Sequence, residues 1–211
     1  MGGRMYLGNQ LVTPVILQGT SDVYTPTYKI VNGVALPVTT LSGKEFENVV
    51  EIKSEAVVFA DYSLSGVINM PNLEIVDDDG LSGSFELNQD ITGFLCPKLK
   101  TARDYAFSAA FRETGISTVR FQSLDEIGEG CFDSCFYGCN NLTDLYFDSV
   151  KTSTFEENTD QFTAMLPTLD TQITIHFPSK MESTIENLDD YPNFGGTSGK
   201  VTLLYDLPAT T

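Results

Sequence analysis

The chain has 211 residues, of which 41% are hydrophobic and 19% charged, a globular composition with enough apolar residues to form a core. Its 12 Lys and Arg against 29 Asp and Glu give a formal net charge of -17, which argues against nucleic acid and anionic membrane surfaces as partners. No apolar run approaches the length of a membrane span and no signal peptide is recognisable, so we expect synthesis in a cytoplasm without membrane insertion.

Residues 1–60 are expected to form a small N-terminal β module. Apolar stretches alternate there with turn residues, in RMYLGNQLVTPVIL, TYKIVNGVALPVTTL and NVVEIKSEAVVFADYSL. Gly8-Asn9 and Asn32-Gly33 stand between such stretches, and Asn-Gly flanked by apolar residues is a strong signal of a tight hairpin turn. We therefore predict a hairpin at each of these turns and a domain boundary near residue 60.

Residues 61–178 contain an internal repeat. Apolar residues recur at offsets of 25 and 26, and a further copy follows at an offset of 30. Successive turns are expected to place Ile68, Phe94, Val119, Leu145 and Ile175 at one position, and Met70, Cys96, Phe121, Phe147 and Phe177 at another. Each apolar-x-apolar pair predicts a short strand whose alternate side chains enter one core. Because one such unit cannot bury its apolar side alone, the turns must stack into a solenoid.

Residues 179–211 are expected to cap this solenoid. The segment predicts a short amphipathic helix around Glu182 to Leu188, then a break, and then a last strand in KVTLLYDLP. The predicted fold class is therefore mainly β, with parallel strands in the solenoid and little helix.

The best-preserved turn resembles a known repeat family. Its sequence, LDEIGEGCFDSCFYGCNNLTDLYFDSV, is similar to the BspA-like leucine-rich repeats of bacterial and microbial surface proteins. The matching elements are Ile127-Gly128, Cys131-Phe132, 136–139, 141–143 and 145–147. The resemblance covers residues 116–155 and implies a short leucine-rich-repeat-like solenoid with parallel strands.

Two shorter resemblances concern the ends of the chain. The opening MYLGNQLVTPVI is similar to the starts of small virion-associated proteins of tailed bacteriophages, which place a short β module ahead of such repeats. The closing HFPSKMESTIENLDDYPNFGGTSGKV is similar to segments of phage repeat proteins. Together they imply a structural or appendage protein of a phage particle.

Three of the four cysteines follow a C-x3-C-x3-C spacing, at Cys131, Cys135 and Cys139. Tetrahedral zinc needs four ligands, and the remaining candidates are Cys96 and the single histidine, His176. The repeat aligns Cys131 and Cys135 with Ala106 and Ala110, and free cysteine packs like a small hydrophobic residue. We favour core packing over the alternatives, a zinc site or a disulfide. Acidic residues at 77–79 could offer oxygen ligands to calcium, but their spacing is ordinary turn chemistry.

The repeat also predicts an outward row of side chains. Side chains alternate along a strand, so if the phenylalanines at 121, 147 and 177 point inward, the residue before each of them must point outward. The outward residue of the preceding turn lies in line with these three. These candidate binding residues are Leu95, Arg120, Tyr146 and His176. Tyr and Arg are favoured anchors in interfaces, so the row is a candidate recognition surface; the alternative is an ordinary solvated strand face with His176 exposed.

We therefore expect a non-enzymatic structural or appendage protein of a bacteriophage virion, whose repeat surface binds a host or partner molecule. No catalytic residues, cofactor or metal ligands are assigned. The expected partners are other virion proteins and a host surface protein or glycan, and we expect a homo-oligomer in the particle. The alternative function is a leucine-rich repeat adhesin located on a bacterial cell surface.

Overall fold

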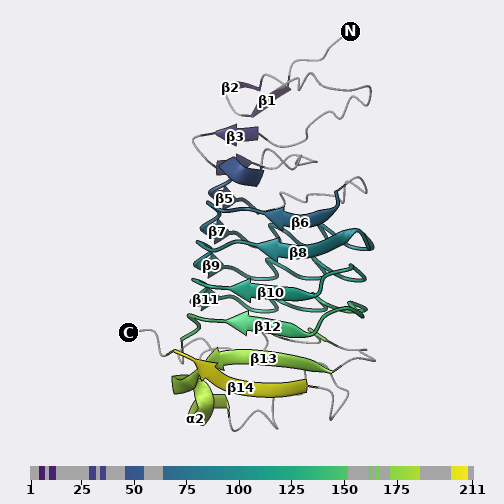
Figure 1. Cartoon of the computed structure of the whole chain (residues 1–211). Helices are drawn as coiled ribbons and strands as arrows, with labels where there is room; N and C mark the ends of the chain where they lie inside the picture. Colours follow the sequence, from purple (N-terminus) through teal and green to yellow (C-terminus); the bar gives the residue numbers. More distant parts are fainter. Residues whose placement is uncertain are drawn as a thin grey trace.

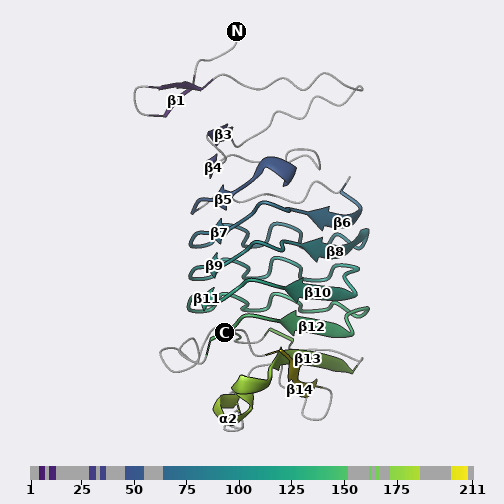
Figure 2. The same ribbon diagram turned by 60° about the vertical axis from the view of Figure 1, so that its left-hand side comes forward.

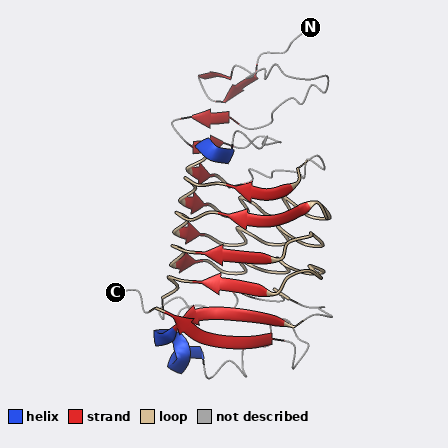
Figure 3. Cartoon of the chain, viewed as in Figure 1, coloured by secondary structure: helices blue, strands red, loops and turns tan. Residues whose placement is uncertain are grey.

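The structure is a computed structural model of the whole chain. It describes residues 5–7, 10–12, 29–31, 34–36, 46–54, 64–151, 162, 165–166, 172–185 and 201–208. These residues form a stack of turns with strands along two sides, and helix is confined to short segments (Figures 1 and 3). The mainly β fold predicted from the repeat is confirmed.

Two sheets of six strands each run along the stack, and we call the one with the longer strands the larger sheet. Its strands are all paired in parallel, in the order β14-β13-β12-β10-β8-β6. Its strands in chain order are β6 (Gly66–Asn69), β8 (Ile91–Leu95), β10 (Thr118–Phe121), β12 (Asp144–Phe147), β13 (Ile173–Pro178) and β14 (Val201–Leu207). Each strand lies one turn of the chain beyond its neighbour, which is the arrangement of a solenoid (Figure 1).

The second sheet runs along another side of the stack (Figure 2), in the order β11-β9-β7-β5-β4-β3. Its strands are β3 (Lys29–Val31), β4 (Val34–Leu36), β5 (Glu51–Ile52), β7 (Ile75–Val76), β9 (Thr101–Ala102) and β11 (Glu126–Ile127). Since β4 pairs in parallel with β5, this sheet is continuous from the N-terminal segment into the repeats.

The strand register reproduces the repeat spacing. Phe94 pairs with Ile68 on one side and with Val119 on the other, and Leu145 pairs with Val119 and with Ile175. These are the residues that the offsets of 25, 26 and 30 place at one position. The predicted alignment of the turns is therefore confirmed.

The remaining side of each turn consists of consecutive tight turns with a four-residue period. Within 103–114, the backbone N–H groups of Ala106, Ala110 and Thr114 donate to the carbonyl oxygen three residues earlier, at 3.2, 3.0 and 3.2 Å. The residue before each donor has a positive φ, between 51° and 54°. Five alternate N–H groups from Tyr105 to Glu113 donate to carbonyl oxygens of the next turn, at 2.6 to 3.0 Å. Neighbouring turns are therefore joined by backbone bonds on this side too.

Three ladders of stacked phenylalanine rings fill the core. The ring centroids are 5.3 to 5.7 Å apart and the planes are within 16° of parallel. The ladders are Phe85-Phe111-Phe136, Phe107-Phe132-Phe162 and Phe121-Phe147-Phe177. Such separations are typical of attractive aromatic pairs, so the same side chains that bury apolar area also set the turn spacing.

The predicted N-terminal hairpins are confirmed as strand pairs. β1 (Met5–Leu7) and β2 (Gln10–Val12) are antiparallel with Leu7 opposite Gln10, and β3 and β4 are antiparallel with Val31 opposite Val34. The turn residues 8–9 and 32–33 lie outside the described residues. The 3-10 helix η1 (Phe46–Asn48) follows, with Phe46 buried.

The C-terminal segment contributes a helix and a strand. The 3-10 helix η2 (Ser179–Met181) leads into α2 (Glu182–Ile185), whereas residues 186–188 of the predicted helix lie outside the described residues. Met181 and Ile185 are buried against the core. The predicted last strand is β14, which lies parallel to β13 and so adds a rung to the larger sheet.

We predict that Phe132→Ala lowers the free energy of unfolding by about 3 to 5 kcal/mol, because the ring is fully buried and its removal leaves a cavity. Phe132 stacks on Phe107 and Phe162 and meets Phe121 and Phe147 edge-on or tilted, so two ladders lose contacts. Urea unfolding followed by circular dichroism measures the change.

The matched control is Val67→Ala, because Val67 lies in a strand of the same solenoid but is 52% exposed. We expect this change to stay within about 0.5 kcal/mol of the parent protein. Equal losses in the two variants would contradict the assignment of the stability to the phenylalanine ladders.

Candidate functional site

One row of side chains on the outer face of the larger sheet takes one residue from each strand, in register. Arg120 pairs with Leu95 and with Tyr146, and Tyr146 pairs with His176. The row continues to Asn69 on β6 and to Leu204 on β14. We call these six residues the outer row: Asn69, Leu95, Arg120, Tyr146, His176 and Leu204. The four candidate residues are therefore brought side by side as the repeat predicts, while their role in binding stays a prediction.

Three members of the outer row form a stack. The guanidinium carbon of Arg120 lies 5.2 Å from the ring centroid of Tyr146. On the other side of Tyr146, the imidazole of His176 lies 4.2 Å away between ring centroids, with 9° between the planes. Arg-aromatic and aromatic-aromatic contacts of this kind are attractive, so the three groups hold one another in place.

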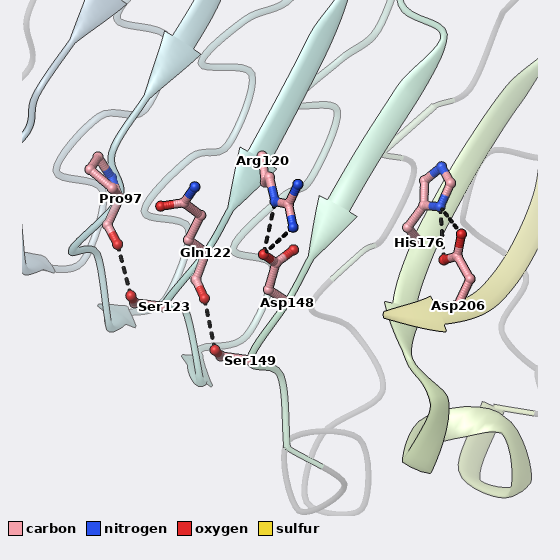
Figure 4. Close-up of polar contacts among 8 residues, drawn as sticks. All are labelled: Pro97, Arg120, Gln122, Ser123, Asp148, Ser149, His176 and Asp206. Carbon is pink, nitrogen blue, oxygen red and sulfur yellow. Dashed lines mark hydrogen bonds and ion pairs between the residues drawn. The ribbon is translucent and has the colours of Figure 1, made fainter. Parts of the chain in front are cut away.

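Asp148 orients Arg120 (Figure 4). Its Oδ2 accepts from Nε of Arg120 at 2.8 Å and lies 2.8 Å from Nη2. The arginine side chain is 45% exposed and that of Asp148 only 19%. The guanidinium is therefore reachable from solvent but held in one orientation. Asp148 follows the inward Phe147 directly, and the sequence analysis did not select it.

The expectation that His176 is exposed is wrong. The residue is 8% exposed, and its Nδ1 lies 2.9 and 3.0 Å from the two carboxylate oxygens of Asp206 on β14 (Figure 4). Its Nε2 lies 3.4 Å from Oδ1 of Asp144. Because β14 adds a strand beside β13, a residue that would otherwise be at an edge becomes enclosed. His176 thus supports Tyr146 and ties β14 to the sheet.

Serine side chains join successive turns next to the outer row. Ser123 donates its hydroxyl to the carbonyl oxygen of Pro97, and Ser149 donates to that of Gln122, both at 2.7 Å (Figure 4). The two serines are themselves one repeat offset apart, and that recurrence is the signal that could have identified them. These bonds hold the ends of β10 and β12, and with them the outer row, at a constant spacing.

The cysteines pack in the core, as the repeat alignment predicts. All four are free thiols and fully buried. The C-x3-C-x3-C spacing is the four-residue period of the tight turns, because the equivalent small positions one turn earlier are Ala106, Ala110 and Thr114. Cys139 donates its Sγ hydrogen to the carbonyl oxygen of Phe111 at 2.8 Å. Burial raises the pKa of all four thiols, which disfavours the reactive thiolate.

Ion pairs occupy the acidic turn at 77–79. Asp77 lies 3.0 Å from Nε of Arg103 and 3.2 Å from Nζ of Lys53, so its carboxylate oxygens already have cationic partners. Within the described part of the chain, His, Cys, Asp and Glu side chains form no group of three or more suited to a metal ion. The same residues include no helix with the length and apolar character of a membrane span.

Comparisons with protein-family models, curated proteins and solved structures return no match for this chain. The geometry of the described residues offers an ordered, partly apolar row of side chains on the outer face of the larger sheet.

We predict that the protein loses stability at alkaline pH through its buried thiols. Their pKa is raised in the folded state, so between the unfolded pKa near 8.5 and the folded value only the unfolded chain ionises. The free energy of unfolding should fall, as pH rises above about 9, by about 1.4 kcal/mol per pH unit for each of the thiols of Cys96, Cys131 and Cys135, whose pKa is raised most by burial. Urea unfolding at several pH values measures the slope.

The control variant is Cys131→Ala, the residue that the chain itself has at the equivalent position 106. Because one ionising thiol is removed, the free energy of unfolding of this variant should fall by about 1.4 kcal/mol less per pH unit than that of the parent protein. Native protein should also resist thiol-specific labelling that is complete in urea. An unchanged slope together with rapid labelling of the native protein would contradict the buried-thiol assignment.

Proposed function

We propose that this chain is a non-enzymatic structural protein of a bacteriophage particle and that its outer row binds a protein or glycan partner. One observation carries the binding proposal: Arg120 and Tyr146 are partly exposed yet already held in position by Asp148 and His176. A side chain ordered before binding loses less conformational entropy when a partner arrives. Arg and Tyr are also the residue types that most often dominate binding energy.

Leu95 adds apolar surface to the same row. It is 49% exposed and lies beside Arg120, and Val67, 52% exposed, lies on the adjacent strand. Gly93 lies between Val67 and Thr118 in the neighbouring outward row and is covered by the Val67 side chain, since a Cβ on Gly93 would lie 3.3 Å from Cγ2 of Val67. An interface centre commonly combines such apolar area with an anchoring Arg or Tyr, so the pattern suits a macromolecular partner.

The assignment to a phage particle is supported by the sequence resemblances. The opening MYLGNQLVTPVI is similar to virion-associated proteins, and in this proposal the N-terminal β module docks to other virion proteins. The strongly acidic composition favours solubility in a crowded assembly. The second candidate is a bacterial surface adhesin, which the similarity of residues 116–155 to BspA-like repeats favours.

We predict that Arg120→Ala and Tyr146→Ala each weaken partner binding about tenfold or more, as expected when an anchor worth at least 1.4 kcal/mol is lost. The partner is first captured on the immobilised protein, from dissociated particles and from host envelope fractions, and is then purified. Its affinity is measured for the parent and variant proteins.

The matched control is Arg112→Ala. Arg112 also lies over a tyrosine ring, at 5.0 Å from the centroid of Tyr137, and has a similar exposure, but it belongs to the tight-turn side. Its removal should change the affinity less than threefold. If all three variants bind as the parent does, the outer row is an ordinary strand surface.

The location is tested separately by mass spectrometry of purified particles. We expect peptides of this chain at a fixed ratio to the major structural proteins. Particles that lack the chain, together with antibody labelling of it on bacterial cells, would favour the adhesin over the virion protein.

A further inference from the structure

The ring of Tyr146 is covered on both faces. The guanidinium carbon of Arg120 lies 5.2 Å from its centroid on one side, and the imidazole of His176 stacks on the other at 4.2 Å. Aromatic side chains bind sugar rings through an open face, because the electron-rich face attracts the C–H groups of the sugar. Tyr146 therefore presents its edge and its hydroxyl group to a partner, but no stacking face.

The carboxylates beside the outer row are engaged within the protein. Oδ2 of Asp148 accepts from the arginine of the row, and the oxygens of Asp206 lie 2.9 and 3.0 Å from Nδ1 of His176. Asp144 accepts from the hydroxyl group of Thr143 at 2.7 Å and lies 3.4 Å from Nε2 of His176. Carboxylates are good acceptors for sugar hydroxyl groups, but each of these three already has a partner in the chain.

Two exposed aliphatic side chains lie together at one end of this face. Val67 is 52% exposed and Leu95 is 49% exposed. Val67 pairs with Gly93, and Leu95 lies on the same strand as that glycine and pairs with Arg120. We call Val67 and Leu95 the apolar pair. Apolar side chains beside an arginine are typical of the centre of a protein interface.

Arg120 adds hydrogen-bond donors next to the apolar pair. A guanidinium donates through Nε and both terminal nitrogens, and Nε and Nη2 are the atoms that contact Asp148. Nη1 has no partner among the described residues and is left to donate to another molecule. Asp148 balances the charge of Arg120 and the whole chain carries a net charge of -17, so an uncharged acceptor suits this position better than the phosphate or carboxylate of an anionic glycan.

We propose that the partner of the outer row is a protein, which places an apolar side chain on the apolar pair and a carbonyl oxygen on Nη1 of Arg120. The surface around these groups on the partner is neutral or basic, because an acidic chain repels anionic surfaces. This inference rests on the proposed function and narrows it, since a protein and a glycan were both left open there.

Retention of dissociated particles and host envelope fractions on the immobilised full-length protein tests the proposal. One portion of each fraction is treated with periodate, which cleaves sugars at neighbouring hydroxyl groups, and another with proteinase K. We expect the parent protein to retain the same component before and after periodate, and to lose it after proteinase K. Leu95→Ser should weaken binding about tenfold, because it removes exposed aliphatic area beside the anchoring arginine.

The matched control is Leu87→Ser. Leu87 is the same residue type and is 50% exposed, but it lies on the tight-turn side, where its N–H group donates to the following turn. Its replacement should change the affinity less than threefold. Circular dichroism shows whether both variants are folded, and retention supports the proposal only together with this dependence on Leu95.

Three results would overturn the protein assignment: binding that periodate abolishes, a retained component that is a second copy of this chain, or a Leu95→Ser variant that binds as the parent does. If Arg120→Ala still weakens binding in these cases, the proposed function stands and only the class of partner is wrong. If nothing is retained through Arg120, both the proposed binding function and this inference fail.

Discussion

The structure depends on one constraint: no turn can satisfy its apolar residues or its backbone without the next turn. Phe107 is buried only because rings of its own and the following turn lie against it, and its N–H group donates to Cys131 in that following turn at 2.9 Å. The backbones of successive turns lie close together, since a Cβ on Gly128 would lie 2.5 Å from the backbone of Arg103. Hydrogen bonding and burial therefore require the same spacing, and a repeat of 25 or 26 residues satisfies both.

The surface follows from this spacing. Arg103 pairs with Asp77 and Lys151 with Asp125, each across 26 residues, so opposite charges meet wherever the repeat puts them on successive turns. Exposed pairs of this kind contribute little stability individually. Their effect is to keep a strongly acidic chain locally balanced. On the larger sheet the same register converts residues distant in sequence into the outer row, a rigid surface on a structure with little helix.

Much of this could be predicted from the residues. Matching apolar positions at fixed offsets predict which side chains stack, as Phe111 does on Phe136, and alternation along a strand predicts that Arg120 and Tyr146 point away from the core. The free, buried thiols also follow, because Cys131 occupies a position where a neighbouring turn has alanine. The C-x3-C-x3-C pattern follows the four-residue period of the tight turns. The sequence alone does not reveal that period, because positive φ leaves little signal outside glycine.

The sequence by itself determined the stacked turns, the inward phenylalanines and the outward alignment of Leu95, Arg120, Tyr146 and His176, because these follow from local periodicity. Only the tertiary structure decided which of them are exposed to solvent. Whether His176 is exposed depends on the position of β14, and the orientation of Arg120 depends on Asp148. Exposure and side-chain orientation are set by contacts between segments about 30 residues apart, and a repeat pattern within one strand carries no information about them.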